Sequence, residues 1–149
     1  MIALGCDHGG LNLKKAIANY FDSKAIPYKD FGTFTEESVD YAPIAYKVAK
    51  SVADGICDKG ILCCGTGIGI SIAANKVKKI RAAVCTDEFT TEMTRKHNDA
   101  NILCLGGRVI SSDKALNLVK IFLTTDFEGG RHSRRIDQIS KIENGEMDI

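Results

Sequence analysis

The fold of this chain is decided by residues 60–71, which read Gly-Ile-Leu-Cys-Cys-Gly-Thr-Gly-Ile-Gly-Ile-Ser. The first half, up to Cys64, is a short apolar run that is typical of a buried β-strand. Glycine then occupies positions 65, 67 and 69, and we expect a helix to open over residues Ser71 to Lys76. A glycine loop between a strand and a helix leaves backbone N–H groups open to a ligand. This stretch therefore predicts a cradle for an anion or a developing oxyanion.

Composition narrows the class of protein. The chain has 149 residues, 44% of them hydrophobic, and a formal net charge of +1, so we expect a single domain over residues 1–149. A near-neutral chain lacks the basic excess of a general nucleic-acid binder. No apolar run approaches the roughly 20 residues of a membrane span, and no basic signal segment follows Met1. We expect a cytoplasmic protein with no nucleic-acid or membrane partner.

The cysteines predict a reduced protein with one unusual thiol. Five of the six lie in apolar runs that we interpret as strands: Cys6, Cys63, Cys64, Cys85 and Cys104. Cytosolic thiols stay reduced, and the absence of a Cys-x-x-Cys motif argues against a zinc or thioredoxin-like site. Neighbouring strand residues face opposite ways, so Cys63 is expected in the core and Cys64 at the cleft. A helix beginning beside Cys64 would favour its thiolate.

Apolar runs alternate with helical patterns along the whole chain. The runs predict five strands, at Ile2–Cys6, Tyr28–Phe31, Ile61–Cys64, Ala82–Thr86 and Ile102–Leu105. Asp87 and Ser112 are expected to cap helices near 88–97 and 113–124, and isoleucines at 136, 139 and 142 mark a last helix. This alternation predicts an α/β protein with a three-layer Rossmann-like fold, in which a five-stranded parallel sheet has helices on both faces.

Ligands of such folds bind outside the carboxyl ends of the strands. The polar and glycine-rich segments follow the predicted strands at that edge: residues 7–10, 64–69, 86–88 and 106–108. The loop at 65–69 does not fit the nucleotide motifs, because no Gly-Lys-Ser/Thr follows it and Ile70 stands where a dinucleotide loop has its third glycine. Asp87, about 20 residues on, keeps a nucleotide-binding interpretation open. A purely structural turn is the other alternative.

Two further groups of polar residues have both a structural and a functional interpretation. Asp7-His8 and His97-Asn98-Asp99 are either helix caps and helix ends or parts of a site. The segment 131–135, Arg-His-Ser-Arg-Arg, is either a solvated surface or a phosphate clamp. Arg131 and Arg135 would share one helix face, and guanidinium groups match phosphate oxygens.

Together these segments resemble the type B ribose-5-phosphate isomerases nearly end to end. The resemblance rests on Gly5-Cys6-Asp7-His8, Asp40-Tyr41, the run from Cys64 to Lys76, His97-Asn98-Asp99 and Glu128-Gly-Gly-Arg-His132. That family also contains galactose-6-phosphate isomerase subunits and allose-6-phosphate isomerases. The resemblance thus implies the type of reaction and leaves a 6-phosphohexose open as an alternative substrate.

The resemblance implies interconversion of D-ribose 5-phosphate and D-ribulose 5-phosphate, a pentose phosphate pathway reaction, through a cis-enediolate and without a metal or other cofactor. It makes Cys64 the proton-transferring base, His97 the residue that assists ring opening and Thr66 a helper. Some relatives use a glutamate farther along the loop, but residues 71–73 offer none. The implied substrate contacts are Asp7, His8, Gly65, Thr66, Gly67, Ile68, Gly69, Asn98, Arg108, Arg131 and Arg135.

The resemblance also implies a homodimer, or sometimes a tetramer, with sites shared between subunits. An isoleucine-striped tail at about 134–149 needs a partner surface, and we expect it to take part in dimerisation. Two other classes of function stay open from the residues alone. Cys64 and His97 could form a nucleophile and base for acyl transfer or amide hydrolysis, or the loop could belong to a non-catalytic nucleotide-binding module.

Overall fold

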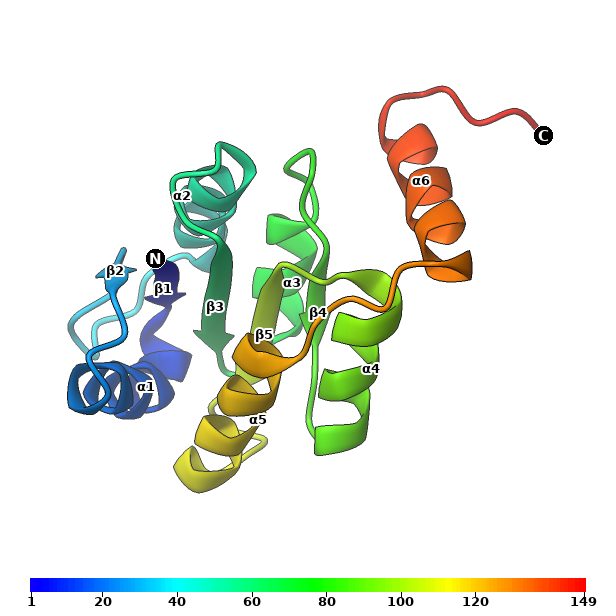
Figure 1. The fold of residues 1–149 in the computed structure, drawn as a ribbon. Coiled ribbons are helices and arrows are strands. Elements are labelled where there is room, and N and C mark those ends of the chain that lie inside the picture. Colours follow the sequence, from blue (N-terminus) through cyan, green and yellow to red (C-terminus); the bar gives the residue numbers. More distant parts are fainter.

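The computed structural model describes residues 1–149 and is built around one parallel sheet. Its five strands are β1 (Ile2–Cys6), β2 (Tyr28–Asp30), β3 (Lys59–Cys64), β4 (Ala82–Val84) and β5 (Ile102–Gly106). They lie in the order β2-β1-β3-β5-β4, and every neighbouring pair is parallel. The predicted five-stranded parallel sheet is confirmed, and Figure 1 shows it between its helices.

Both faces of the sheet are buried, which is why the strands are continuously apolar. On one face, α1 (Leu11–Ser23) and α5 (Ser112–Thr124) cover a core that includes Leu4, Ile61 and Leu103. On the other, α2 (Tyr41–Ala53) and α3 (Ile68–Ala74) cover a core that includes Leu62 and Ile102. The α4 helix (Glu88–Asn98) packs beside α5. The three-layer prediction is therefore confirmed.

Several predicted boundaries differ from the structure. The α3 helix begins at Ile68 rather than Ser71, because Gly67, with φ +82°, makes the turn into the helix directly. The cap of α5 is Ser111, whose hydroxyl accepts a hydrogen bond from the Lys114 N–H, so the prediction of Ser112 is wrong. Strand β4 ends at Val84, which leaves Cys85 outside the strand.

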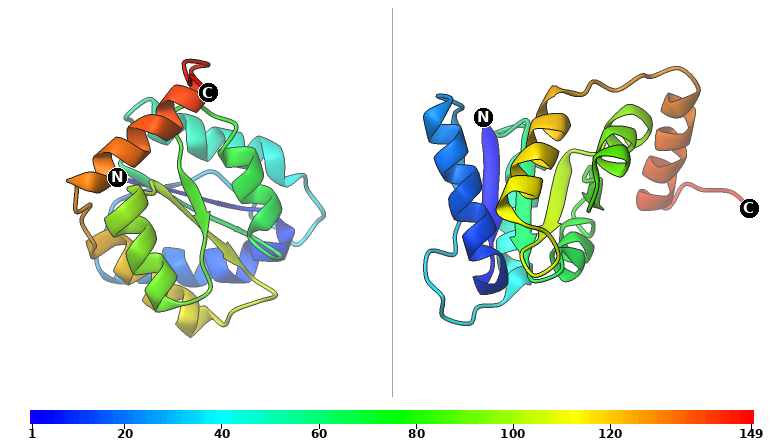
Figure 2. Two further views of the ribbon diagram at one scale, coloured as in Figure 1. Left: turned by 90° about the vertical axis from the view of Figure 1, so that its right-hand side faces the viewer. Right: turned by 90° about the horizontal axis from the view of Figure 1, so that it is seen from below.

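The last helix, α6 (Arg131–Glu143), stands apart from the sheet. It begins three residues earlier than the predicted tail. The right-hand view of Figure 2 shows it beyond α4, away from the three layers. Only His132 of this helix is buried, and the Ile139 and Ile142 side chains are 47% and 63% exposed. None of the helices combines the length and the apolar character needed to cross a bilayer.

At the carboxyl edge of the sheet, three loops meet backbone to backbone. A methyl group on Gly10 would overlap the carbonyl group of Cys63, and one on Gly107 would overlap the carbonyl oxygen of Gly9. A methyl group on Gly106 would lie 2.7 Å from the carbonyl carbon of Thr66. Glycine is thus required by close approach at these positions, and the approach fixes the three loops relative to one another.

We predict that Gly10→Ala lowers the free energy of unfolding by about 2 kcal/mol or more, because backbone must move to admit the methyl group. Urea unfolding measures this effect. The control is Gly55→Ala, where nothing lies within 4 Å of the new methyl group and only the positive φ of +75° is strained. Amide signals of residues 63–67 should shift in Gly10→Ala and not in the control. Equal stability and equal spectra of the two variants would contradict the close-contact account.

Candidate active site

The first group of predicted site residues lies at the carboxyl edge of the sheet. Asp7 follows β1, and its Oδ1 accepts a hydrogen bond from the Gly9 N–H at 2.8 Å, which caps a short 3₁₀ turn over His8–Gly10. The Nδ1 of His8 accepts from the Val39 N–H at 3.2 Å. Accepting at Nδ1 places the ring proton of a neutral His8 on Nε2. His8 can therefore donate to a ligand from Nε2.

Cys64 ends β3 beside the glycine loop. Its Sγ accepts a hydrogen bond from the Gly67 N–H at 3.0 Å, and its side chain packs in the core opposite to that of Cys63. The two side chains face opposite ways, as strand alternation predicts, but both are buried: Cys64 is 4% exposed and Cys63 is 0% exposed. That Cys64 faces a cleft stays a prediction. An N–H that donates to sulfur stabilises negative charge on it.

Burial acts on the thiols of three other cysteines in this region. It raises the pKa of the Cys6 thiol to about 11 and raises the pKa of the Cys63 and Cys104 thiols well above their ordinary value. These three thiols therefore stay protonated near neutral pH, where a base must accept a proton. The geometry leaves Cys64 as the sulfur that can serve the glycine loop.

Thr66, Ile68 and Arg108 complete this edge. The Oγ1 of Thr66 accepts from the Ile68 N–H at 3.2 Å, and both of these side chains are exposed. The Arg108 N–H donates to the Gly65 carbonyl oxygen at 2.9 Å. A methyl group on Gly65 would lie 3.0 Å from the Arg108 Nη1, so this guanidinium covers the start of the loop. A cation beside loop N–H groups forms a surface suited to an anionic ligand.

Tyr41 also approaches the loop. A methyl group on Gly69 would lie 2.8 Å from the Tyr41 ring, so the absence of a side chain at Gly69 is what admits the ring. The tyrosine is 43% exposed, and its hydroxyl has no protein partner among the hydrogen bonds of the structure. Tyr41 therefore forms one wall of this candidate site.

The second group of predicted residues lies at the opposite edge of the sheet. His97 and Asn98 end α4, and Arg131 and Arg135 lie on the first turns of α6. The Arg81 Nε, just before β4, donates to the Asn98 carbonyl oxygen at 2.8 Å. This bond places the end of α4 at the amino ends of the strands. In Figure 1 the arrowhead of β3 points away from α6.

The structure does not bring the two groups together within one chain. Cys64 pairs with Gly106, the last residue of β5, whereas Asn98 precedes the first residue of β5. A strand rises about 3.3 Å per residue, so β5 alone separates the groups by roughly 15 Å. A Cys64–His97 nucleophile and base pair for acyl transfer therefore does not exist in a single chain, since such a pair needs hydrogen-bond contact.

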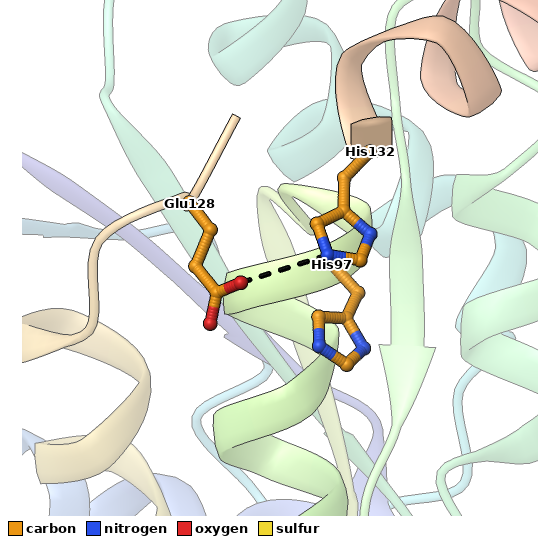
Figure 3. Close-up of side chains that lie close together, drawn as sticks. All are labelled: His97, Glu128 and His132. Atoms are coloured by element: carbon orange, nitrogen blue, oxygen red, sulfur yellow. Dashed lines mark ion pairs between the residues drawn. The ribbon is translucent and has the colours of Figure 1, made fainter. Parts of the chain in front are cut away.

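Two residues absent from the predicted site join the second group. The His132 ring stacks on the His97 ring, with centroids 4.3 Å apart and planes inclined by 13°. The Glu128 Oε2 lies 3.6 Å from the His132 Nε2, as Figure 3 shows. Burial lowers the pKa of His132, and electrostatic interactions with His97 and Arg131 lower it further. The sequence placed both residues in a shared motif, but no local pattern predicts the stacking.

The donor atoms of His97, Glu128 and His132 lie within 4.8 Å of one another, which raises the question of a metal site. A metal ion binds an imidazole nitrogen in the plane of the ring. Two stacked planes inclined by only 13° do not meet within bonding distance of both rings. As arranged, the two histidines therefore cannot share one metal ion.

A doubly covered parallel sheet with a glycine loop, a thiol and arginines defines an α/β protein with a candidate site for an anionic ligand. More particularly, the chain belongs to the Ribose/Galactose Isomerase family, whose model matches residues 2–139. It is similar to ribose-5-phosphate isomerase B of Escherichia coli, with 45% identity over 142 residues and 95% of each chain covered.

Solved structures agree with that assignment. The chain is similar to ribose-5-phosphate isomerase B of Clostridium thermocellum, with a TM-score of 0.95, 52% identity, and 98% and 99% of the two chains covered. It is also similar to ribose-5-phosphate isomerase B of Mycoplasma genitalium with bound ribulose 5-phosphate, with a TM-score of 0.91, 41% identity, and 96% and 95% covered. The resemblance inferred from the sequence motifs is thereby confirmed at the level of the family.

Proposed function

We propose that this chain is an aldose–ketose isomerase that interconverts D-ribose 5-phosphate and D-ribulose 5-phosphate, as in the pentose phosphate pathway, without a metal or other cofactor. The observation that carries the proposal is the Cys64 sulfur at the glycine loop, where it meets the Gly67 N–H at 3.0 Å. The likeness to a relative with bound ribulose 5-phosphate supports the choice of substrate. The six free cysteines suit a reducing compartment such as the cytoplasm.

The chemical step needs a base and a group that stabilises an oxyanion. The Cys64 thiolate removes the C2 proton of the open-chain aldose, and the electron pair of the C–H bond forms a cis-enediolate. The same thiol then returns a proton to C1, the C2 hydroxyl passes its proton to O1, and the resulting C2 carbonyl gives the ketose. N–H groups of residues 65–69, helped by the Thr66 hydroxyl, contact the enediolate oxygens, and one such donor contributes roughly 3–4 kcal/mol in known enzymes.

Ring opening needs a second acid–base group, and the proposal assigns it to His97. Because His97 lies at the other edge of the sheet, His97 of the partner subunit must serve the Cys64 site. The proposed enzyme is therefore a homodimer in which one chain supplies Asp7, His8, Cys64, the loop 65–69 and Arg108. The partner supplies its own copies of His97, Asn98, Arg131 and Arg135.

Exposed apolar side chains support this assembly. The Ile68 and Ile72 side chains on α3 are 54% and 57% exposed. The Ile139 and Ile142 side chains of α6 line a groove beside Asn98. Apolar side chains gathered at an exposed groove are typical of an interface between subunits. Dimerisation would bury them and bring the loop of one chain toward α4 and α6 of the other.

The arginines have the role of binding the phosphate, far from the reacting carbons. Arg131 and Arg135 are exposed and four residues apart on α6, so both guanidinium groups lie on one helix face. Arg108 contributes a third guanidinium from the loop edge. Binding at the unreacting phosphate holds C1 and C2 against Cys64, and this positioning increases the rate of proton transfer.

We predict that, in the presence of a chelator, the initial isomerisation rate is highest with ribose 5-phosphate. Allose 6-phosphate and galactose 6-phosphate are tested at equal concentrations, and their initial rates show how well the same site accepts a longer carbon chain. A preference for either hexose phosphate would favour the alternative substrate. No turnover of any sugar phosphate, together with thermal stabilisation by a nucleotide, would instead support a non-catalytic nucleotide-binding module.

We predict that Cys64→Ala lowers isomerisation by about 10²–10⁴-fold, the usual contribution of a positioned base. Exchange of the substrate C2 hydrogen with heavy water should disappear with turnover. The matched control is Cys63→Ala, which removes the neighbouring thiol on the opposite face of the sheet and should keep most of the activity. Retention of more than about half of the activity by Cys64→Ala would mean that another group is the base.

A further inference from the structure

His132 is an unusual anchor for a helix. It is the only buried residue of α6, with 5% exposure, whereas the Ile139 and Ile142 side chains of the same helix are exposed. An aliphatic residue would attach α6 to the molecule equally well by burial alone. The buried position instead carries an imidazole, and that imidazole covers one face of the His97 ring.

The chain between α5 and α6 is folded so that this contact forms. The Arg95 Nε donates to the Thr125 carbonyl oxygen at 3.1 Å, and the Glu128 N–H donates to the Lys96 carbonyl oxygen at 3.1 Å. Gly129 and Gly130, both with positive φ, then turn the chain into α6. Two attachments to α4 and a glycine turn thus bring His132 onto the last turn of that helix.

His97 needs such support. It is the second-last residue of α4, its side chain is only half buried, and helix ends fray. No hydrogen bond to another protein group fixes either of its ring nitrogens among the side-chain bonds of the structure. The His132 ring, itself beside the Glu128 carboxylate at 3.6 Å, is the flat surface that holds the plane of the His97 ring.

We propose that His132 is a positioning residue for ring opening: its stacked ring, held beside Glu128, fixes the plane of the His97 imidazole against the sugar ring. This inference rests on the proposed function, because it takes His97 as the group that transfers a proton to or from the sugar ring. A proton transfer requires hydrogen-bond geometry between donor and acceptor. A His97 ring that turns freely would meet that geometry only part of the time.

Two variants of nearly equal size separate positioning from anchoring. His132→Leu keeps an apolar anchor for α6 and removes the flat ring, whereas His132→Phe keeps a flat ring and removes the nitrogen atoms. Ser133→Ala, at the next position, is the control for local disturbance, and His97→Asn gives the size of the effect when the acid–base group is lost. Circular dichroism and thermal unfolding check that each variant is folded.

Two measurements are compared for each variant. Turnover of saturating ribose 5-phosphate requires ring opening. Loss of deuterium from C1 of labelled ribulose 5-phosphate to water requires Cys64 but no ring opening. We predict that His132→Leu lowers the first rate by about 10- to 100-fold, the loss expected from misplacing a reacting group, and changes the second by less than about twofold. His132→Phe and Ser133→Ala should keep both rates near those of wild type. His97→Asn should lower the first rate more than His132→Leu does and should likewise leave the second rate nearly unchanged.

The inference is overturned if His132→Leu turns over ribose 5-phosphate as fast as wild type, or if it loses both rates equally. It is also overturned if His132→Leu raises KM with kcat unchanged, which would mean that His132 only anchors the phosphate-binding arginines of α6. Failure of the proposed function is distinguishable, because wild type would then isomerise no sugar phosphate, or His97→Asn would not separate the two rates. If His132→Leu does not fold, His132→Phe provides the test. A folded His132→Phe that loses turnover of ribose 5-phosphate but keeps deuterium loss from ribulose 5-phosphate would contradict the role of the flat ring.

Discussion

Backbone contact among three loops is the constraint on which the carboxyl-edge site depends. Gly10 lies against Cys63, Gly107 against Gly9, and Gly106 against Thr66, each too close for a side chain. The same loops are joined by hydrogen bonds, including one from the Gly107 N–H to the Cys64 carbonyl oxygen at 2.8 Å. These contacts fix the Cys64 sulfur relative to the loop N–H groups before any ligand binds. The proposed oxyanion cradle is therefore preorganised, which is the condition under which such donors act most strongly.

The topology of the sheet divides the remaining chemistry between two edges. In an alternating α/β chain, each helix returns antiparallel to the strand before it, so the end of α4 must lie at the amino edge. His97 and Asn98 are consequently separated from Cys64 by the length of the strands. The stacked His132 and the arginines of α6 gather at the same amino edge as His97. Each edge thus holds half of the proposed active site, and the proposal takes the other half from a second copy of the chain.

The sequence was sufficient for the sheet, the helical layers and the glycine loop, because continuous apolar runs and glycine spacing are local signals. Strand alternation also predicted that Cys63 and Cys64 face opposite ways, and the structure agrees, although it buries both of them. The start of α3 was missed because a positive φ at Gly67 sets it without a capping side chain. Ser111 and Ser112 are equally good caps by residue type, so the sequence could not choose between them. The stacking of His132 on His97 joins residues 35 positions apart by number and depends on tertiary contacts alone.

The central claim is that each active site takes Cys64 from one chain and the arginines of α6 from the other. The most direct measurement mixes two inactive variants, Cys64→Ala and Arg131→Ala/Arg135→Ala, and follows isomerisation as subunits exchange. Native mass spectrometry reports the fraction of heterodimers in the same samples. The account predicts that activity returns in proportion to the heterodimers, with one intact site in each. Heterodimers that form in full and stay inactive would contradict it, because Cys64 and the arginines would then serve one site from the same chain.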